Sequence, residues 1–229
     1  MLTISAKRGK WRDRGGIEAS GDDKSFATRR PQALSRDGGR CRFCGVKLSR
    51  MHVHHKDDDH ANNELQNLMT VDDLCHAVNH VGLLGKSGVI AYLPALSQED
   101  ISHLTRAMLV VIARGGKMAE LAKALGEHLF LGFAGPVEDV FGSSNPSDFG
   151  NALLLMGDSS YNSRSMPLRD VRVLFRLGDL SKNTGDIGKS IYPNSPDDIV
   201  ASWRRIADDI DGNSGDDDDD EKDAHGVAQ

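Results

Sequence analysis

The sequence predicts an α+β chain in which a small metal-braced module precedes a mainly helical region. Three observations predict this class. Residues 41–80 are dense in Cys, His, Asp and Asn but hold too few large apolar side chains for a conventional core. Residues 89–93 (VIAYL) indicate a short buried strand that Pro94 closes. Beyond residue 97, apolar side chains recur at the spacing of a helix.

The first 30 residues mix basic side chains with glycines, and residues 2–5 hint at a strand. An early strand and a loosely held basic arm both fit this segment. Pro31 suits the first turn of a helix, so we expect a short helix over residues 31–36 that ends at Gly38 and Gly39. The metal-braced module is expected over residues 31–94.

The helical region is expected over residues 95–210. Ser97 and Asp100 form a capping-box-like start for a helix that runs to Gly115. Further helical segments are expected over residues 118–125, which Gly126 ends, and from Pro136. Two more are expected over residues 149–156, with Ser147 as the cap, and over residues 168–177 after Pro167. A last helix is expected from Ser195, with Ile199, Trp203 and Ile206 on one face.

The net charge of −6 is distributed unevenly along the chain. Residues 1–50 carry 13 Lys and Arg against 5 Asp and Glu, whereas residues 211–229 carry 1 against 8. We expect this low-complexity acidic tail to be disordered. The overall acidity therefore does not exclude a basic face near the N-terminus that binds nucleic acid or protein.

Apolar segments long enough to cross a membrane are not found in the sequence. The longest apolar run, residues 108–113, is far shorter than the roughly 18 to 20 residues of a membrane helix. The first 16 residues lack the apolar stretch of a secretory signal. We therefore expect a cytoplasmic protein without direct membrane insertion, in which three cysteines do not form a disulfide framework.

Four side chains are the candidate ligands of a structural Zn²⁺ ion. Cys41 and Cys44 form a CxxC pair followed by a glycine, which suits one edge of a tetrahedral zinc site. A single CxxC motif is also compatible with redox chemistry. Asp72 and Cys75 lie three residues apart, on one face of a helical turn, and supply the other edge. His80 is the rival for the fourth position.

Six of the nine histidines lie between residues 52 and 80. The order of motifs in this segment resembles that of the HNH endonuclease ββα-metal module. The CxxC pair comes first, followed by the paired histidines His54 and His55, the NELQNL stretch at 63–68, and the DxxC pair with His76 directly after it. The alternative is that these histidines merely pack, or lie on a solvated loop, beside the zinc.

The resemblance implies a role for each matched residue. His55 would be the general base, His54 and His76 would bind a catalytic divalent ion such as Mg²⁺, and Asn67 would fix the site. The zinc is then only a brace. An acidic run at residues 57–59 departs from this picture, because it would repel a phosphodiester unless metal ions neutralise it.

A narrower resemblance covers about residues 30–210. Here the chain is similar to the IcmJ (DotN) family of type IVB secretion and conjugation systems. The similar stretches are SRDGGRCRFCG at 35–45, NNELQNLMT at 62–70, YLP with the following LSQ, PSDFGNALL and a C-terminal tryptophan helix. The most specific part is residues 35–112.

This second resemblance implies an adaptor rather than an enzyme. Members are subunits of a type IV coupling complex, peripheral to the inner membrane, and they bind the C-terminal extension of the coupling ATPase together with other subunits to help recruit substrates. Candidate core or interface positions here are Leu104, Met108, Trp203 and Ile206. Because the HNH histidines are kept, the alternative is a metal-dependent nuclease acting on DNA, with basic residues 7–50 along the phosphate backbone.

Overall fold

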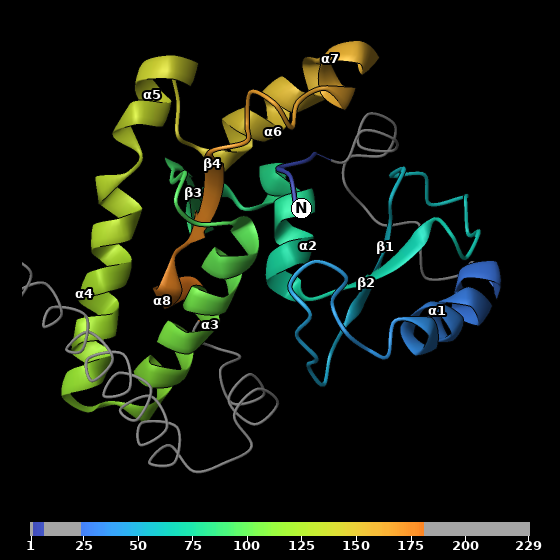
Figure 1. Ribbon diagram of the computed structural model, residues 1–229, viewed down its shortest axis with the longest axis horizontal. Helices are drawn as coiled ribbons and strands as arrows, with labels where there is room; N and C mark the ends of the chain where they lie inside the picture. Colours follow the sequence, from blue (N-terminus) through green and yellow to red (C-terminus); the bar gives the residue numbers. More distant parts are fainter. Residues whose placement is uncertain (1, 7–23, 181–229) are drawn as a thin grey trace, which may run out of the picture. The chain divides into compact units, whose positions relative to one another are not determined.

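The computed structural model describes residues 2–6 and 24–180 of the 229-residue chain (Figure 1). The expected helix that begins at Ser195, most of the basic arm and the acidic tail lie outside the described residues. The helices are α1 (Lys24–Arg36), α2 (Asp73–Asn79), α3 (Gln98–Arg114), α4 (Gly116–Gly132), α5 (Gly135–Phe141), α6 (Pro146–Leu155), α7 (Asp158–Asn162) and α8 (Leu177–Leu180), with 3₁₀ turns η1 (Val81–Leu83) and η2 (Gly85–Ser87). The strands are β1 (His52–His55), β2 (Leu68–Val71), β3 (Gly88–Tyr92) and β4 (Val171–Phe175).

The strands form two small antiparallel sheets, which confirms a mixed α and β architecture. In the first sheet β1 pairs with β2, with His54 opposite Met69, and α2 follows directly. In the second sheet β3 pairs with β4, with Ile90 opposite Val173. The expected strand at residues 89–93 is confirmed, and its partner comes from the far end of the described chain.

The strand that pairs with β3 lies in a segment that the sequence predicts to be helical. Residues 168–177 were expected to be helical, but residues 171–175 form β4. The segment VRVLF is rich in the β-branched and aromatic residues that suit a half-buried strand, and β3 offers it a partner. Gln98 closes the other edge of β4, because its side-chain amide both donates to the Val173 carbonyl, at 3.0 Å, and accepts from the Val173 N–H, at 2.8 Å.

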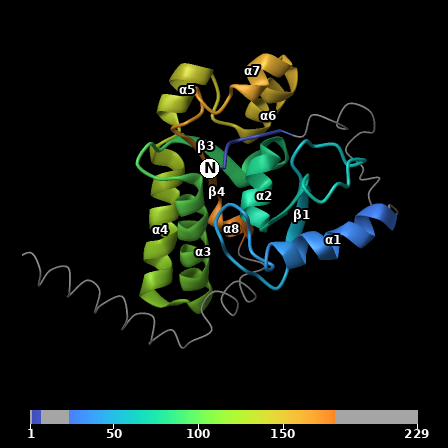
Figure 2. The same cartoon turned by 45° about the vertical axis from the view of Figure 1, so that its right-hand side comes forward.

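Helix α3 follows the sequence prediction, whereas α4 extends beyond it. A full capping box joins Ser97 and Asp100, and Gly115 ends α3 with a φ of 74°. Helix α4 continues through Gly126 to Gly132 instead of stopping. Leu177 explains the glycine, because a Cβ at position 126 would lie 2.4 Å from its Cδ1. Helices α3 and α4 lie side by side as a hairpin (Figure 2).

Two other helix starts differ from those predicted. Helix α1 begins at Lys24, a full two turns before Pro31, which the helix tolerates in its interior. Its expected end is confirmed, since Gly38 and Gly39 adopt φ values of 62° and 66°. The cap of α6 is Asn145 rather than Ser147, because the Asn145 side chain accepts the Ser147 N–H at 2.8 Å.

The main core lies between α2, the β3–β4 sheet, α6 and the N-terminal residues. Residues 2–6 form no strand. Ser5 donates to the Val78 carbonyl and accepts from the Val81 N–H, and the Arg164 guanidinium donates to the Ile4 carbonyl. A smaller cluster between α3 and α4 holds Met108, which is buried, and Leu104, which is partly buried. Among the described residues, no helix is both long and apolar enough to cross a bilayer.

Candidate metal centres and an exposed apolar surface

The four residues predicted to bind zinc come together in space. Their ligand atoms, on Cys41, Cys44, Asp72 and Cys75, all lie within 4.8 Å of one another. The group is called the Cys₃Asp centre below. All but Cys44 are buried, and none of the three cysteines forms a disulfide. The cluster can therefore hold a metal ion.

Local structure explains why these side chains converge. The turn that carries Cys41 and Cys44 is closed by the Gly45 N–H, which donates to the Cys41 carbonyl at 2.9 Å, and Gly45 has the φ of 74° that this turn requires. Asp72 is the N-cap of α2, and its Oδ1 accepts the Leu74 N–H at 3.0 Å. Cys75 is then in the first turn of α2, on the same side as Asp72.

The three thiols interact strongly with one another. The pKa of Cys41 is lowered, because the thiols of Cys44 and Cys75 hydrogen-bond to its sulfur. The same bonds raise the pKa of Cys44 to about 12 and raise the pKa of Cys75, since each thiol keeps its proton in order to donate it. A metal ion at this position would replace those protons and stabilise all three thiolates.

Arg106 also contacts the Cys₃Asp centre, and the sequence analysis did not identify it. Its side chain is 1% exposed and forms an ion pair with Asp72. The same Nη2 lies 3.3 Å from Cys44 Sγ. A signal was present in the sequence, because Gln98, Ser102 and Arg106 follow at four-residue intervals and place a polar line on the buried face of α3.

A second cluster is formed by His54 of β1, His76 of α2 and His80, the residue that caps the C-terminus of α2, and is called the three-histidine centre below. Their ring nitrogens lie within 4.8 Å of one another, and the Nε2 atoms of His76 and His80 are 3.1 Å apart. His76 and His80 are one helical turn apart, so both face β1. The structure thus places His80 here, and not at the Cys₃Asp centre for which it was the rival ligand.

The surroundings of the three-histidine centre hold its rings in place. The ring of His52 stacks on His76 with centroids 4.9 Å apart, and its Nε2 is bound by the Asp73 carboxylate. The hydrogen bond from His52 lowers the pKa of Asp73, so this carboxylate stays ionised at neutral pH. Three imidazoles are a common environment for a transition-metal ion.

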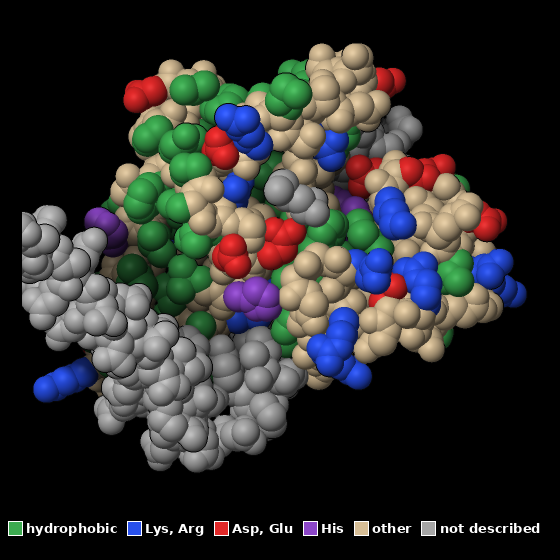
Figure 3. Space-filling view, viewed as in Figure 1, with side chains coloured by type: hydrophobic (Ala, Val, Ile, Leu, Met, Phe, Trp, Pro, Cys, Tyr) green, Lys and Arg blue, Asp and Glu red, His purple; other side chains and the backbone are tan. Residues whose placement is uncertain are grey.

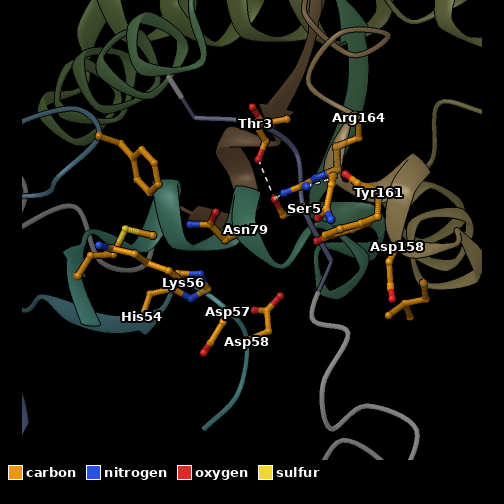
Figure 4. A pocket seen from close by; sticks show the side chains of 14 residues that line it. Thr3, Ser5, His54, Lys56, Asp57, Asp58, Asn79, Asp158, Tyr161 and Arg164 are labelled. Carbon is orange, nitrogen blue, oxygen red and sulfur yellow. Dashed lines mark hydrogen bonds between the residues drawn. The ribbon is translucent and has the colours of Figure 1, made fainter. Parts of the chain in front are cut away.

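A polar cleft of about 720 Å³ opens beside this second centre (Figure 4). It is lined by His54, by Lys56, Asp57 and Asp58 of the loop after β1, and by side chains of the N-terminal segment and α7, among them Ser5, Asp158 and Tyr161. Arg164 also lines it, but its Nη2 donates to Ser5 Oγ at 2.7 Å and its guanidinium stacks on the Tyr161 ring. Three carboxylates thus face the cleft.

His55, the predicted general base, lies on the other face of β1. Successive residues of a strand point to opposite sides, so His54 and His55 are separated by the sheet. The His55 side chain is buried, and its Nε2 is 2.9 Å from Asn63 Oδ1. Its ring packs beside Phe26 and His60. Among the described residues that line the cleft, His55 is absent.

Asn67 braces the loop between β1 and β2. Its amide nitrogen donates to Asp57 Oδ1 at 2.8 Å and to the Asn62 carbonyl at 2.9 Å, while its Oδ1 accepts the Asp57 N–H at 3.2 Å. Partial burial would raise the pKa of Asp57, but hydrogen bonds from the Asn67 amide, the Asp59 N–H and the Asn62 amide outweigh it and lower the pKa. Asn67 therefore fixes a loop that lines the cleft and does not itself reach the three-histidine centre.

The outer side of α4 and α5 exposes an unusual amount of apolar surface. Figure 3 shows hydrophobic side chains along this side of the molecule. Met118, Leu121 and Leu125 are 64%, 61% and 45% exposed and follow one face of α4, and they are called the α4 stripe below. Val140 and Phe141 of α5 are also exposed. The apolar face of α4 is thus wider than the part that α3 covers.

Comparison of the chain with models of known protein families and with curated proteins found no match.

Proposed function

We propose that the chain is a zinc-braced adaptor that binds the C-terminal part of a type IV coupling ATPase, as the resemblance to the IcmJ family implies. The α4 stripe is the observation that carries this proposal. Large apolar side chains that follow one helix face and remain exposed are typical of a protein-binding surface. Recruitment by the ATPase would place the protein at the inner membrane.

The metal of the Cys₃Asp centre is proposed to be zinc. Three thiolates and one carboxylate are a donor set that zinc accepts in tetrahedral structural sites, where ligands at 2.0–2.3 Å lie about 3.3–3.8 Å apart. The four ligand atoms lie within 4.8 Å of one another, so shifts of about 1 Å would bring them to this spacing. The order β1, β2, α2 around the two centres supports the HNH-like ββα fold that the histidine pattern implied.

The adaptor proposal predicts that acidic substitutions in the stripe abolish binding of the ATPase. The double variant Leu121→Glu and Leu125→Glu is expected to bind the C-terminal part of the ATPase at least about 100-fold more weakly, because a charge buried without a partner costs several kcal/mol. Binding is measured by titration calorimetry with the coupling ATPase encoded with this chain.

Lys123→Glu is the matched control. It changes the net charge by the same −2, but Lys123 lies on the solvent side of α4, where it pairs with Glu120 at 2.8 Å. The control is expected to bind like the wild type. Equal binding by the double variant would place the docking surface elsewhere, and no binding by the wild type would refute the adaptor function.

The three-histidine centre favours a second candidate, a metal-dependent nuclease. Three imidazoles beside a cleft are suited to hold a divalent ion that polarises a phosphodiester. The burial of His55 away from the cleft favours the adaptor over this candidate, as does a cleft lined by three carboxylates against two cations, Lys56 and Arg164.

The nuclease candidate predicts plasmid nicking in Mg²⁺, Mn²⁺ or Ni²⁺ that falls at least about 100-fold in the His54→Ala and His55→Ala variants. His128→Ala, at an exposed position of α4, is the control and is expected to keep full activity. Nicking gels at high protein concentration decide the matter. A wild-type protein without metal-dependent nicking, or nicking that survives both substitutions, excludes this candidate.

A further inference from the structure

Arg106 is the one lysine or arginine that is buried among the described residues. A buried guanidinium is costly unless charges and hydrogen bonds compensate it. Its Nη1 has no hydrogen-bond partner within the described part of the chain, and the contacts that compensate the charge are made by Nη2. The partners that compensate it are two ligands of the Cys₃Asp centre, Asp72 and Cys44.

The two oxygens of the Asp72 carboxylate have different partners. Its Oδ1 accepts both the Leu74 N–H and the Arg106 guanidinium. Its Oδ2 lies 3.2 Å from Cys44 Sγ and so faces the thiols. Arg106 therefore orients the carboxylate such that a single oxygen points at the position that the four ligand atoms surround.

The net charge of the metal-loaded centre also favours a cation at the position of Arg106. Three thiolates and one carboxylate around Zn²⁺ would carry a net charge of −2, which is unfavourable in a buried site. Arg106 offsets half of this charge. A guanidinium stays protonated in proteins, and the Asp72 carboxylate and the Cys44 sulfur that it contacts stabilise its charge.

Helix α3 contacts the centre at two further points. The Ser102 hydroxyl lies 3.9 Å from Cys75 Sγ, and the His103 Nε2 lies 3.0 Å from the Cys44 carbonyl. With Arg106, these contacts place one side of α3 against the metal ligands, although α3 supplies no ligand itself.

We propose that Arg106 is a positioning residue of the Cys₃Asp centre, which holds Asp72 in a one-oxygen binding mode, offsets the ligand charge and joins α3 to the metal site. The inference rests on the proposed zinc and is independent of the adaptor function. A residue of this kind tunes the metal affinity by 10- to 100-fold in other metal sites.

The test compares Arg106→Met and Arg106→Lys with Arg114→Met, an exposed arginine at the end of α3. Zinc affinity is measured by competition with a chromogenic chelator, and the ligand field by the absorption spectrum of the Co²⁺-substituted protein. Arg106→Met is expected to bind zinc about 10- to 100-fold more weakly and to shift the visible Co²⁺ bands, because Asp72 is no longer held. Arg114→Met is expected to match the wild type in both.

Circular dichroism at saturating zinc checks that each variant folds. If Arg106→Met does not fold, Arg106→Lys decides, and it is expected to bind zinc about 10-fold more weakly because an ammonium group lacks the planar fork of a guanidinium. A folded variant with wild-type affinity and an unchanged Co²⁺ spectrum overturns the role of Arg106. A wild-type chain that binds neither zinc nor cobalt overturns the zinc proposal itself.

Discussion

Removing the metal from the Cys₃Asp centre is expected to unfold the part of the chain around β1, β2 and α2. The turn with Cys41 and Cys44 and the loop between the two strands contribute few large apolar side chains to the core. Structural zinc ions supply an apparent binding free energy of about 10–16 kcal/mol in small domains, which exceeds the stability of a typical domain. Because α2 carries Cys75 and His76 and ends at the His80 cap, the same loss would disperse the three-histidine centre.

The measurement is metal analysis followed by thermal unfolding. The purified chain is expected to hold at least one equivalent of zinc, and a strong chelator is expected to abolish the cooperative transition. Cys75→Ser should have the same effect without chelator, because an alcohol is a poor zinc ligand. Thr105→Ser, a comparably buried and conservative change on α3, should cost only about 1 kcal/mol. Metal-free protein with an unchanged transition would contradict a structural role for the metal.

The substitution Gly150→Ala is expected to destabilise the fold by about 3 kcal/mol. Helix α6 crosses η1 so closely that a Cβ on Gly150 would lie 2.4 Å from the Gly82 Cα and 2.8 Å from the Gly82 nitrogen. Both are backbone atoms, so the clash is relieved only by moving α6 away from η1. The better helix propensity of alanine, worth about 1 kcal/mol, is smaller than this cost.

Urea denaturation monitored by circular dichroism measures the effect. Gly135→Ala is the control, since a Cβ there meets no atom within 4 Å and the substitution should leave the stability within about 0.5 kcal/mol of wild type. If Gly150→Ala is as stable as this control, the close crossing of α6 over η1 is wrong.

Local patterns in the sequence determined the parts of the structure that depend on neighbouring residues. The capping box at Ser97, the helix end at Gly115 and the strand before Pro94 each follow from hydrogen bonds and dihedral preferences within a few residues. The spacing of Cys41 with Cys44, and of Asp72 with Cys75, likewise placed each pair on one turn. These are the features that a sequence can specify without a tertiary contact.

The tertiary structure decided the features that require partners far along the chain. Residues 171–175 form a strand paired with β3, and α4 continues through Gly126, where Leu177 packs in the space that a side chain would need. His80 joins the three-histidine centre and Arg106 reaches Asp72 from α3, 34 residues away. Spacing alone predicts which ligands can share a turn, because helical turns are local. Which cluster a side chain joins, and which buried charge compensates another, depends on how the elements pack.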